Sequence, residues 1–490
     1  MNSSIQFQPI QSIPAQAAVF FAFEDSAPLT GLPGVDQWAA GLYSSGEFTG
    51  KLFELAILHT PAGLAANRAI LLGAGKAAKL DHSLARKLGG AAVRSLKSKS
   101  ILALAVALEG PWQTPEFVQA LAEGALAGNF EPDEHKSKKE SKQIESIVFA
   151  APGGSTELAE ALHRGAVLGA AQNFARDLIN QPGNILPPVE LAARAAHMAA
   201  SQGLAVDILD EHRMRQLGMG SLLAVAQGSA QPPALIVLRY EPAEPKGDVH
   251  LGLIGKGVTF DTGGISIKPS ENMEKMKYDM AGGAAVIGAM MAIAQLKPSV
   301  RVTALIPAVE NMPGSQAVRP GDIVRSYSGK TVEILNTDAE GRLILIDAIT
   351  YARQLGVNRI IDAATLTGAI TIALGAVHVG AFSNNDGWQN ELLAAAKAAG
   401  EKMWPMPMDD DYKDLLKSAF ADMPNIGSRG AGSITAALFL REWVEDTPWV
   451  HLDIAGTAWL DEPKPFLSKG PTGVGLRTFV ELVRRLESLS

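Results

Sequence analysis

The octapeptide NTDAEGRL, residues 336–343, is the stretch around which the chain is organised. Within it, Asp338 and Glu340 stand two residues apart, Gly341 allows the backbone to turn sharply, and Arg342 follows directly. Two carboxylates at this separation repel each other, which raises the pKa of one of them unless a cation lies between them. The octapeptide therefore indicates a metal site on a polar loop.

Two glycine-rich segments upstream carry further candidate ligands. They read GKGVTFDTGGISIK at residues 255–268 and KYDMAGG at residues 277–283. A strand-like run at residues 250–254 would place Lys256 at its carboxyl end, which is where open α/β sheets hold their chemistry. Together with the octapeptide, these segments offer carboxylate, lysine and arginine side chains on glycine-rich turns.

These segments resemble the leucine aminopeptidase (cytosol aminopeptidase) family of two-metal exopeptidases. All eight positions of the octapeptide match the family signature, and residues 255–268 match the family's G-K-G-x-T-F-D-[ST]-G-G-x-S-I-K pattern. The resemblance covers about residues 180–490 and is weaker before them. It implies a metal-dependent, leucyl-type aminopeptidase that releases N-terminal, preferably apolar residues from peptides.

The resemblance also implies how two divalent metal ions per subunit would be held. Asp261 and Glu340 would bridge the two ions. Asp338 would complete the shell of one ion, and Lys256 and Asp279 that of the other. Such a ligand set suits Mn²⁺ or Zn²⁺, with Mg²⁺ and Co²⁺ as further candidates. A lysine ligand must be neutral, so adjacent divalent charge has to lower its pKa far below ~10.4.

Catalytic and substrate-binding residues follow from the same resemblance. Lys268 would stabilise the oxyanion of the tetrahedral intermediate, and Arg342 would hold a bicarbonate that serves as general base. Residues from three segments would contact the substrate: Met276, Thr365, Leu366, Gly368 and residues 455–458. Taken singly, each candidate also fits a capping, surface or core role, but five candidate ligands at the family spacing favour the metal site.

Composition sets the broad class of protein. The chain has 490 residues, of which 47% are hydrophobic and 19% charged, so it can form a large core. Because it has no cysteine and no His-Glu-x-x-His pair, cysteine nucleophiles, disulfides and ordinary zinc-protease architecture are excluded. We expect no signal peptide in the first 25 residues and no window long enough to span a bilayer. These features predict a cytoplasmic protein.

Apolar runs alternate with helical patterns, which predicts an α/β fold. We expect a smaller N-terminal α/β domain at residues 1–154, a connecting helix at 155–180 and a larger catalytic domain at 181–490. Strands are expected at residues 18–22, 69–73, 101–106, 147–150, 235–238, 250–254, 302–306, 332–335 and 359–362. Helices are expected at residues 83–96, 284–296 and 343–351. The larger domain should hold a mostly parallel sheet with helices on both faces.

The residues alone leave two alternative functions open. Carboxylate clusters also serve phosphoryl chemistry, so one alternative is a two-metal phosphoesterase. The other is an additional DNA-binding role, which some bacterial relatives of the family have; a net charge of −8 argues against a nucleic-acid partner. The family resemblance further implies a homohexamer, two trimers whose active sites face an internal cavity.

Overall fold

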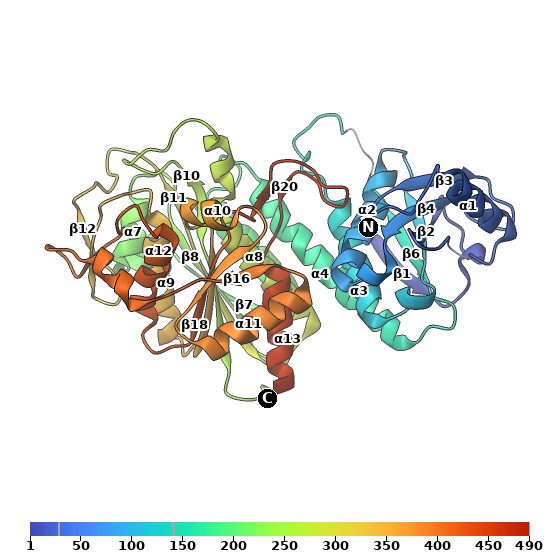
Figure 1. Cartoon of the computed structure of the whole chain (residues 1–490). Coiled ribbons are helices and arrows are strands. Elements are labelled where there is room, and N and C mark those ends of the chain that lie inside the picture. The colour runs from blue at the N-terminus through green and yellow to red at the C-terminus, as the bar shows by residue number, and fades with distance from the viewer. Residues whose placement is uncertain (28–29, 140–142, 490) are drawn as a thin grey trace. The chain divides into compact units, whose positions relative to one another are not determined.

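The computed structural model of this protein describes residues 1–27, 30–139 and 143–489. The chain forms two compact units. The smaller unit comprises residues 1–173 with 461–470, and the larger one comprises residues 174–460 with 471–490. Both are mixed α/β units, so the predicted fold class is confirmed (Figure 1).

The smaller unit is built on a six-stranded sheet with the order β1-β6-β5-β2-β4-β3. Its strands are β1 (Asn2–Gln6), β2 (Ala17–Phe23), β3 (Leu55–His59), β4 (Arg68–Gly75), β5 (Ala103–Ala107) and β6 (Ser146–Ala150). The four buried strands were expected from their apolar runs. Edge strands β1 and β3 were not expected: β1 is polar, whereas β3 was missed although its sequence, LAILH, is largely apolar. Only the β3–β4 pair in this sheet is antiparallel.

Helices accompany this sheet, and the last of them leads out of the smaller unit. They are α1 (Pro33–Ser45), α2 (His82–Lys97), α3 (Pro115–Asn129) and α4 (Thr156–Asn180), with short 3₁₀ turns η1 (Ile10–Ser12), η2 (Ala77–Lys79) and η3 (Gly110–Trp112). Helix α4 begins and ends where its sequence predicts, because Pro182 cannot continue a helix. Its residues are divided between the two units at Asn173.

The larger unit is built on a nine-stranded sheet, most of whose strand pairs are parallel as expected. Its strands are β7 (Ala205–Leu209), β8 (Ala234–Tyr240), β9 (His250–Gly255), β10 (Gly257–Asp261), β11 (Arg301–Asn311), β14 (Arg359–Ala364), β15 (Val379–Ser383), β16 (Met403–Pro405) and β18 (Trp449–Asp453). Strand β8 runs antiparallel to both β7 and β11, and β15 runs antiparallel to β18.

Short strands outside this sheet include the one that precedes the octapeptide. They are β12 (Ile323–Arg325), β13 (Thr331–Glu333), β17 (Met423–Pro424), β19 (Trp459–Leu460) and β20 (Gly470–Pro471). The strand predicted at residues 332–335 is therefore shorter, and it pairs with β12 and β17 instead of joining the main sheet.

Helices cover both faces of the nine-stranded sheet, as predicted (Figure 1). Helices α5, α8, α11 and α13 pack on one face, and α7, α9 and α12 on the other. The helical elements of this unit are α5 (Pro188–Gln202), α6 (Glu211–Leu217), α7 (Gly220–Ala226), η4 (Met273–Met280), α8 (Ala281–Leu296), α9 (Glu340–Gln354), α10 (Gly368–Leu374), α11 (Asp386–Ala399), η5 (Asp410–Leu416), α12 (Gly432–Val444) and α13 (Leu476–Leu489).

One helical stretch, Met273–Leu296, is long and apolar enough to cross a membrane by length and composition. The expectation that no window approaches that length was therefore wrong for this stretch. However, 83% of its most apolar window is buried inside the protein, and α8 within it packs against β9, β11 and α13. The apolar composition of α8 thus builds the core of the larger unit.

Candidate active site

The residues that the sequence predicts as catalytic or metal-binding lie at one edge of the nine-stranded sheet. Strands β9, β10 and β14 end there, followed by Lys256, the 262–268 loop and Thr365, and α9 begins there. A cavity of about 490 Å³ is lined by the predicted catalytic and metal-binding residues and by most of those predicted to bind substrate: Lys256, Asp261, Lys268, Met276, Asp279, Asp338, Glu340, Arg342, Thr365, Leu366 and Gly368. This edge is where parallel sheets hold their sites.

Three carboxylates converge closely in this cavity. One oxygen from each of Asp261, Asp338 and Glu340 lies within 4.8 Å of the other two. Burial, and then the negative charge of Asp261, raise the pKa of Glu340. Within the described ranges, Oε2 of Glu340 is buried and has no hydrogen-bond partner. A buried carboxylate oxygen left without a donor, in a set of hard ligands, fits a divalent cation.

Lys256 lies on the inner wall of the same cluster. Its ammonium nitrogen is 2.8 Å from Asp279 and 2.7 Å from Glu340, and it donates to the Thr365 carbonyl at 3.0 Å. Burial alone would lower the pKa of Lys256, but the charges of Asp279 and Glu340 outweigh it and raise the pKa. Protein groups alone thus hold Lys256 as an ammonium, and only added positive charge could make it a neutral ligand.

Asp279 is fixed by the turn that follows β14. The Thr365 hydroxyl donates to its Oδ1 at 2.6 Å, while Oδ2 faces Lys256. Burial raises the pKa of Asp279 well above its ordinary value. The turn is itself held by Asp453, which accepts hydrogen bonds from the Leu366 backbone and the Thr367 hydroxyl. Asp279 therefore has a single orientation, with one oxygen turned into the cluster.

Lys268 approaches the cluster from the other side. Its ammonium nitrogen lies 2.8 Å from Oδ2 of Asp261 and also pairs with Asp338. The side chain of Lys268 is 22% exposed, whereas that of Lys256 is 3% exposed. A substrate entering the cavity can therefore touch Lys268 but would reach Lys256 only through the carboxylates.

Arg342 points into the cavity from the first turn of α9. Its Nη1 donates to the Asn425 carbonyl at 2.7 Å. Its Nε is buried and, among the described residues, has no hydrogen-bond partner. Burial lowers the pKa of Arg342 to about 10, which still leaves it a cation at neutral pH. The Nε–H group is thus a buried donor left without an acceptor.

The octapeptide is not a loop throughout, which corrects one sequence expectation. Helix α9 begins at Glu340, so Gly341 lies within the helix instead of making a sharp turn. A Cβ atom at Gly341 would lie 2.9 Å from Nζ of Lys256 and 3.0 Å from the Leu366 side chain. The glycine leaves the space through which Lys256 reaches the carboxylates. A glutamate in the first turn is also favoured by the helix dipole.

Sequence reasoning missed several polar residues that hold the site together: Asn311, Thr337, Asn425 and Asp453. Asn311 and Asp453 are the last residues of β11 and β18, at the sheet edge that carries the site, and that position was the available signal. Of the expected 455–458 stretch, Ala455 lines the cavity, whereas Ala458 is buried in the fold.

Both parts of the chain match models of one protein family. Residues 173–480 match the catalytic domain of the cytosol aminopeptidase family, and residues 19–139 match its N-terminal domain. A probable cytosol aminopeptidase of Solibacter usitatus is 56% identical over 482 residues, covering 98% of this chain and 99% of that protein. Another, of Koribacter versatilis, is 49% identical and covers 91% of each chain.

Solved structures agree with the family models. A mutant of tomato leucine aminopeptidase superposes with a TM-score of 0.89 at 36% identity, covering 99% of this chain and 96% of that one. The bottromycin maturation enzyme BotP, in complex with Mn, superposes with a TM-score of 0.86 at 32% identity, covering 96% of this chain and all of that one. These identities are high enough to compare more than the fold.

These matches define the class of protein as a hydrolase that acts on peptides. The chain belongs to the cytosol aminopeptidase family, whose members depend on metal ions. The predicted family resemblance is thereby confirmed, and it extends into the N-terminal region, where the sequence motifs were weaker. Family membership also favours peptide hydrolysis over phosphoester hydrolysis.

Proposed function

We propose that this protein is a two-metal, leucyl-type aminopeptidase that removes the N-terminal, preferably apolar residue from peptides. The observation that carries the proposal is the convergence of Asp261, Asp338 and Glu340 within 4.8 Å, beside a buried lysine. Three carboxylates this close need positive charge between them, and the two neighbouring lysines, Lys256 and Lys268, satisfy only part of that need.

The residues that would hold the metal ions are proposed from the family resemblance, and their contacts support the assignment. We assign Asp261 and Glu340 to both ions, Asp338 to one, and Asp279 with Lys256 to the other; Mn²⁺ and Zn²⁺ are the first candidates, then Mg²⁺ and Co²⁺. When bound, two such ions supply Lewis acidity and an activated water. The unpartnered Oε2 of Glu340 supports this assignment.

The two lysines and the arginine have separate roles in this proposal. Lys268, partly exposed, would donate to the oxygen that gains negative charge during hydrolysis. Lys256, fully buried, would stay within the ligand set. Arg342 would hold a small anion such as bicarbonate, which could accept the proton of the attacking water; its buried, unpartnered Nε supports that role.

The preference for apolar residues is supported by the lining of the cavity beyond the carboxylates. Apolar side chains there include Met276, Leu366, Ile426 and Ala455, with Gly368 opening space between them. We assign Met276, Thr365, Leu366 and Gly368 to substrate binding. Restriction to the first residue is assigned to the Asp279 end of the cluster, which would receive the free α-amino group.

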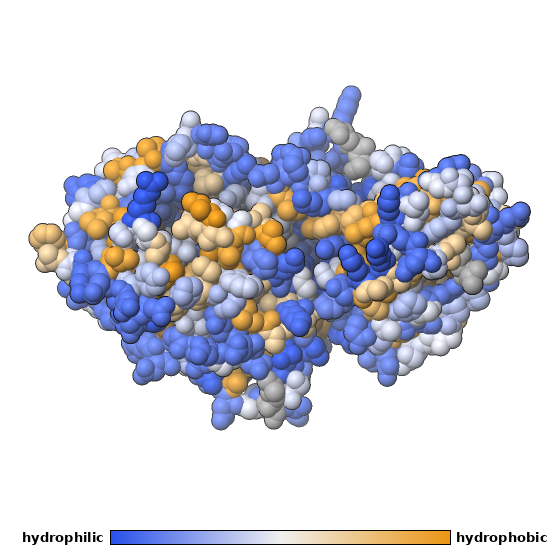
Figure 2. Space-filling view, viewed as in Figure 1, coloured by the Kyte–Doolittle hydropathy of each residue, from blue (hydrophilic) through white to orange (hydrophobic). Residues whose placement is uncertain are grey.

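We also propose that the protein is a cytoplasmic homohexamer. Its relatives are named cytosol aminopeptidases, which supports the location. Large apolar side chains exposed on the larger unit support self-association: Ile372 is 89% exposed, Phe420 77% and Trp404 56%. Figure 2 shows hydrophobic residues exposed at several places on the visible face of this unit. Sedimentation of the purified protein tests the assembly directly.

The function is tested with a panel of substrates and metals. The purified protein, dialysed against a chelator, should be inactive on leucyl-anilide and should recover with Mn²⁺, Zn²⁺ or Co²⁺. Bis-nitrophenyl phosphate should not be cleaved under any of these conditions. Full peptidase activity in protein shown by elemental analysis to be metal-free would overturn the proposal. Thiol reagents should have no effect, because the chain has no cysteine.

A further inference from the structure

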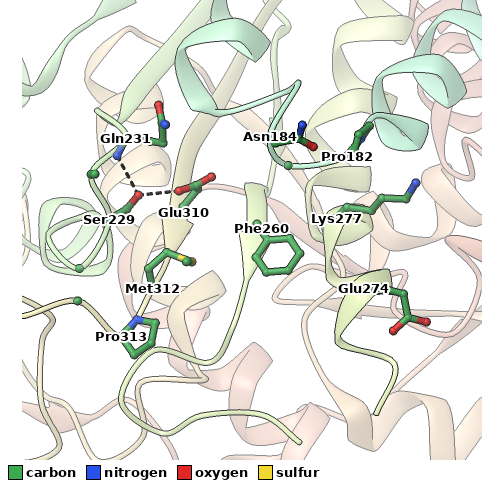
Figure 3. Close-up of a pocket in the computed structure, with 14 residues that line it drawn as sticks. Pro182, Asn184, Ser229, Gln231, Phe260, Glu274, Lys277, Glu310, Met312 and Pro313 are labelled. Atoms are coloured by element: carbon green, nitrogen blue, oxygen red, sulfur yellow. Dashed lines mark hydrogen bonds between the residues drawn. The ribbon is translucent and has the colours of Figure 1, made fainter. Parts of the chain in front are cut away.

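Strands β10 and β11 present different residues on their two faces. They run in parallel, with Phe260 opposite Glu310 and Asp261 opposite Asn311. Phe260 and Glu310 line a separate cavity of about 780 Å³ on one face, where Figure 3 shows both side chains. Because successive residues of a strand point to opposite faces, Asp261 and Asn311 both face the carboxylate cluster.

The side chain of Asn311 donates two hydrogen bonds to residues of the carboxylate cluster and the octapeptide. Its amide nitrogen donates to Oδ1 of Asp261 at 2.9 Å and to the carbonyl of Thr337 at 3.0 Å. Its backbone carbonyl accepts from the amide and hydroxyl of Thr262, at 3.0 and 2.8 Å. Asn311 is 2% exposed. One buried residue thus joins the ends of β10 and β11 to the octapeptide.

These bonds decide which oxygen of Asp261 is available. Oδ1 accepts from both Asn311 and the Gly263 amide, so its lone pairs are taken. Oδ2 remains directed at Lys268 and the centre of the cluster. A carboxylate held at one oxygen by two donors cannot rotate, which fixes the direction from which it meets a cation.

Asparagine is the side chain that this position requires. Both acceptors are oxygens, so they need two N–H donors on a single atom, and aspartate offers none. Gly264 leaves room for this side chain, because a Cβ added at Gly264 would lie 2.7 Å from Oδ1 of Asn311. Thr337, held by Asn311, in turn accepts from the Ser266 amide and donates to the Gly263 carbonyl.

We propose that Asn311 is a positioning residue that sets the affinity of the site for its metal ions. It does so by fixing the rotation of Asp261 and the distance from Asp261 to the segment that carries Asp338. The inference rests on the proposed two-metal function. It goes beyond that function by naming a residue that touches neither substrate nor metal in the assigned ligand set.

The test compares substitutions at Asn311 with one at a matched buried asparagine. Asn311→Ala removes both donors, and Asn311→Asp keeps the shape but places an acceptor against two oxygens. Asn129→Ala is the control, because Asn129 is buried in the smaller unit and its side chain likewise makes two bonds, both to the backbone of Ile144. Titration calorimetry with Mn²⁺ on chelator-treated protein gives the affinity, and thermal unfolding with and without Mn²⁺ gives the metal-induced gain in Tm.

Loss of a residue that orients a ligand typically costs about 10- to 100-fold in metal affinity. We expect Asn311→Ala to lose affinity in that range, Asn311→Asp to lose at least as much, and Asn129→Ala to keep the wild-type affinity. Activity of Asn311→Ala should recover at high Mn²⁺ with KM near wild type. Wild-type Mn²⁺ affinity in folded Asn311→Ala and Asn311→Asp overturns the proposal. A wild-type protein that binds Mn²⁺ without cleaving peptides overturns the proposed function instead.

Discussion

The ammonium nitrogen of Lys268 lies 2.8 Å from Oδ2 of Asp261, the oxygen that Asn311 leaves free. The same ammonium pairs with Asp338. Burial alone would lower the pKa of Lys268, but these carboxylates raise it, so the side chain stays charged at neutral pH. In the proposed ligand assignment a metal ion would use the same oxygens, so Lys268 would compete with it for them.

This competition gives the first prediction. Lys268→Ala should leave metal binding intact or tighten it, because two carboxylates lose a competing cation. The same substitution should reduce kcat by about 10²–10³, since charge on the reacting oxygen would lose a donor. KM should move less. Metal stoichiometry and steady-state kinetics on the purified variant check both parts, and loss of bound metal would show that Lys268 is a ligand.

Lys256→Ala should give the opposite pattern. Lys256 contacts Asp279 and Glu340 deep in the cluster, so its removal takes away a nitrogen ligand and leaves two buried carboxylates unpaired. Metal occupancy after dialysis should fall, and the apo form should melt at a lower temperature than the wild type. Elemental analysis and thermal unfolding test this; full occupancy in the variant would reverse the roles of the two lysines.

The third prediction concerns the free amino group of the substrate. Asp279 is held in one orientation by Thr365, with one oxygen turned into the cluster. If the Asp279 end of the cluster receives the α-amino group of the substrate, Leu-Gly-Gly should be cleaved and its N-acetylated form should survive. Chromatography of the products distinguishes the two. Comparable turnover of both peptides would mean that the amine is not recognised.

The fourth prediction concerns pH and lies away from the site. Asp347 of α9 is fully buried; its carboxylate accepts from the Leu222 and Tyr327 amides, yet burial raises its pKa from 3.8 to about 7. The folded state therefore binds a proton that the unfolded state has lost. Between pH 4 and 7 the free energy of unfolding should fall as pH rises, by up to ~4 kcal/mol from this group.

A matched variant isolates this contribution. Asp347→Asn cannot titrate, so the difference in unfolding free energy between wild type and variant should shift in favour of the variant as pH rises from 4.5 to 7.5. Urea denaturation at several pH values measures that difference. A difference that stays constant with pH would show that Asp347 is already ionised in the folded protein at pH 4.5.

Much of the site could be predicted because the residues that carry its chemistry lie close together in short segments of the sequence. Lys256, Asp261 and Lys268 lie within one glycine-rich segment, and Asp338, Glu340 and Arg342 within another. The structure places them around one cavity. Their roles as ligand, donor and anion holder stay predictions until they are tested by substitution.

The polar residues that hold the site together through hydrogen bonds could not be predicted in the same way. Asn311 meets Asp261 through strand register, which depends on how β10 pairs with β11 and not on spacing along the chain. The same holds for Asn425, whose amide nitrogen donates to the Asn336 carbonyl across 89 residues. In the fold, edge strand β1 escaped prediction because it is polar and an apolar run is the main sequence signal for a strand, whereas β3 was missed although its sequence, LAILH, is largely apolar.

The division of the chain has a consequence for dissecting the protein. The smaller unit includes residues 461–470 from near the C-terminus, so the chain passes between units at residues 173, 460 and 470. Phe466 in that segment packs against Phe53, and its backbone lies against Gly90. A fragment ending at residue 173 would therefore lack part of its own interior. Genetic truncation at the boundary of α4 would yield two incomplete pieces. A gene for either unit would have to join its two separate stretches, residue 173 to 461 for the smaller unit and 460 to 471 for the larger one.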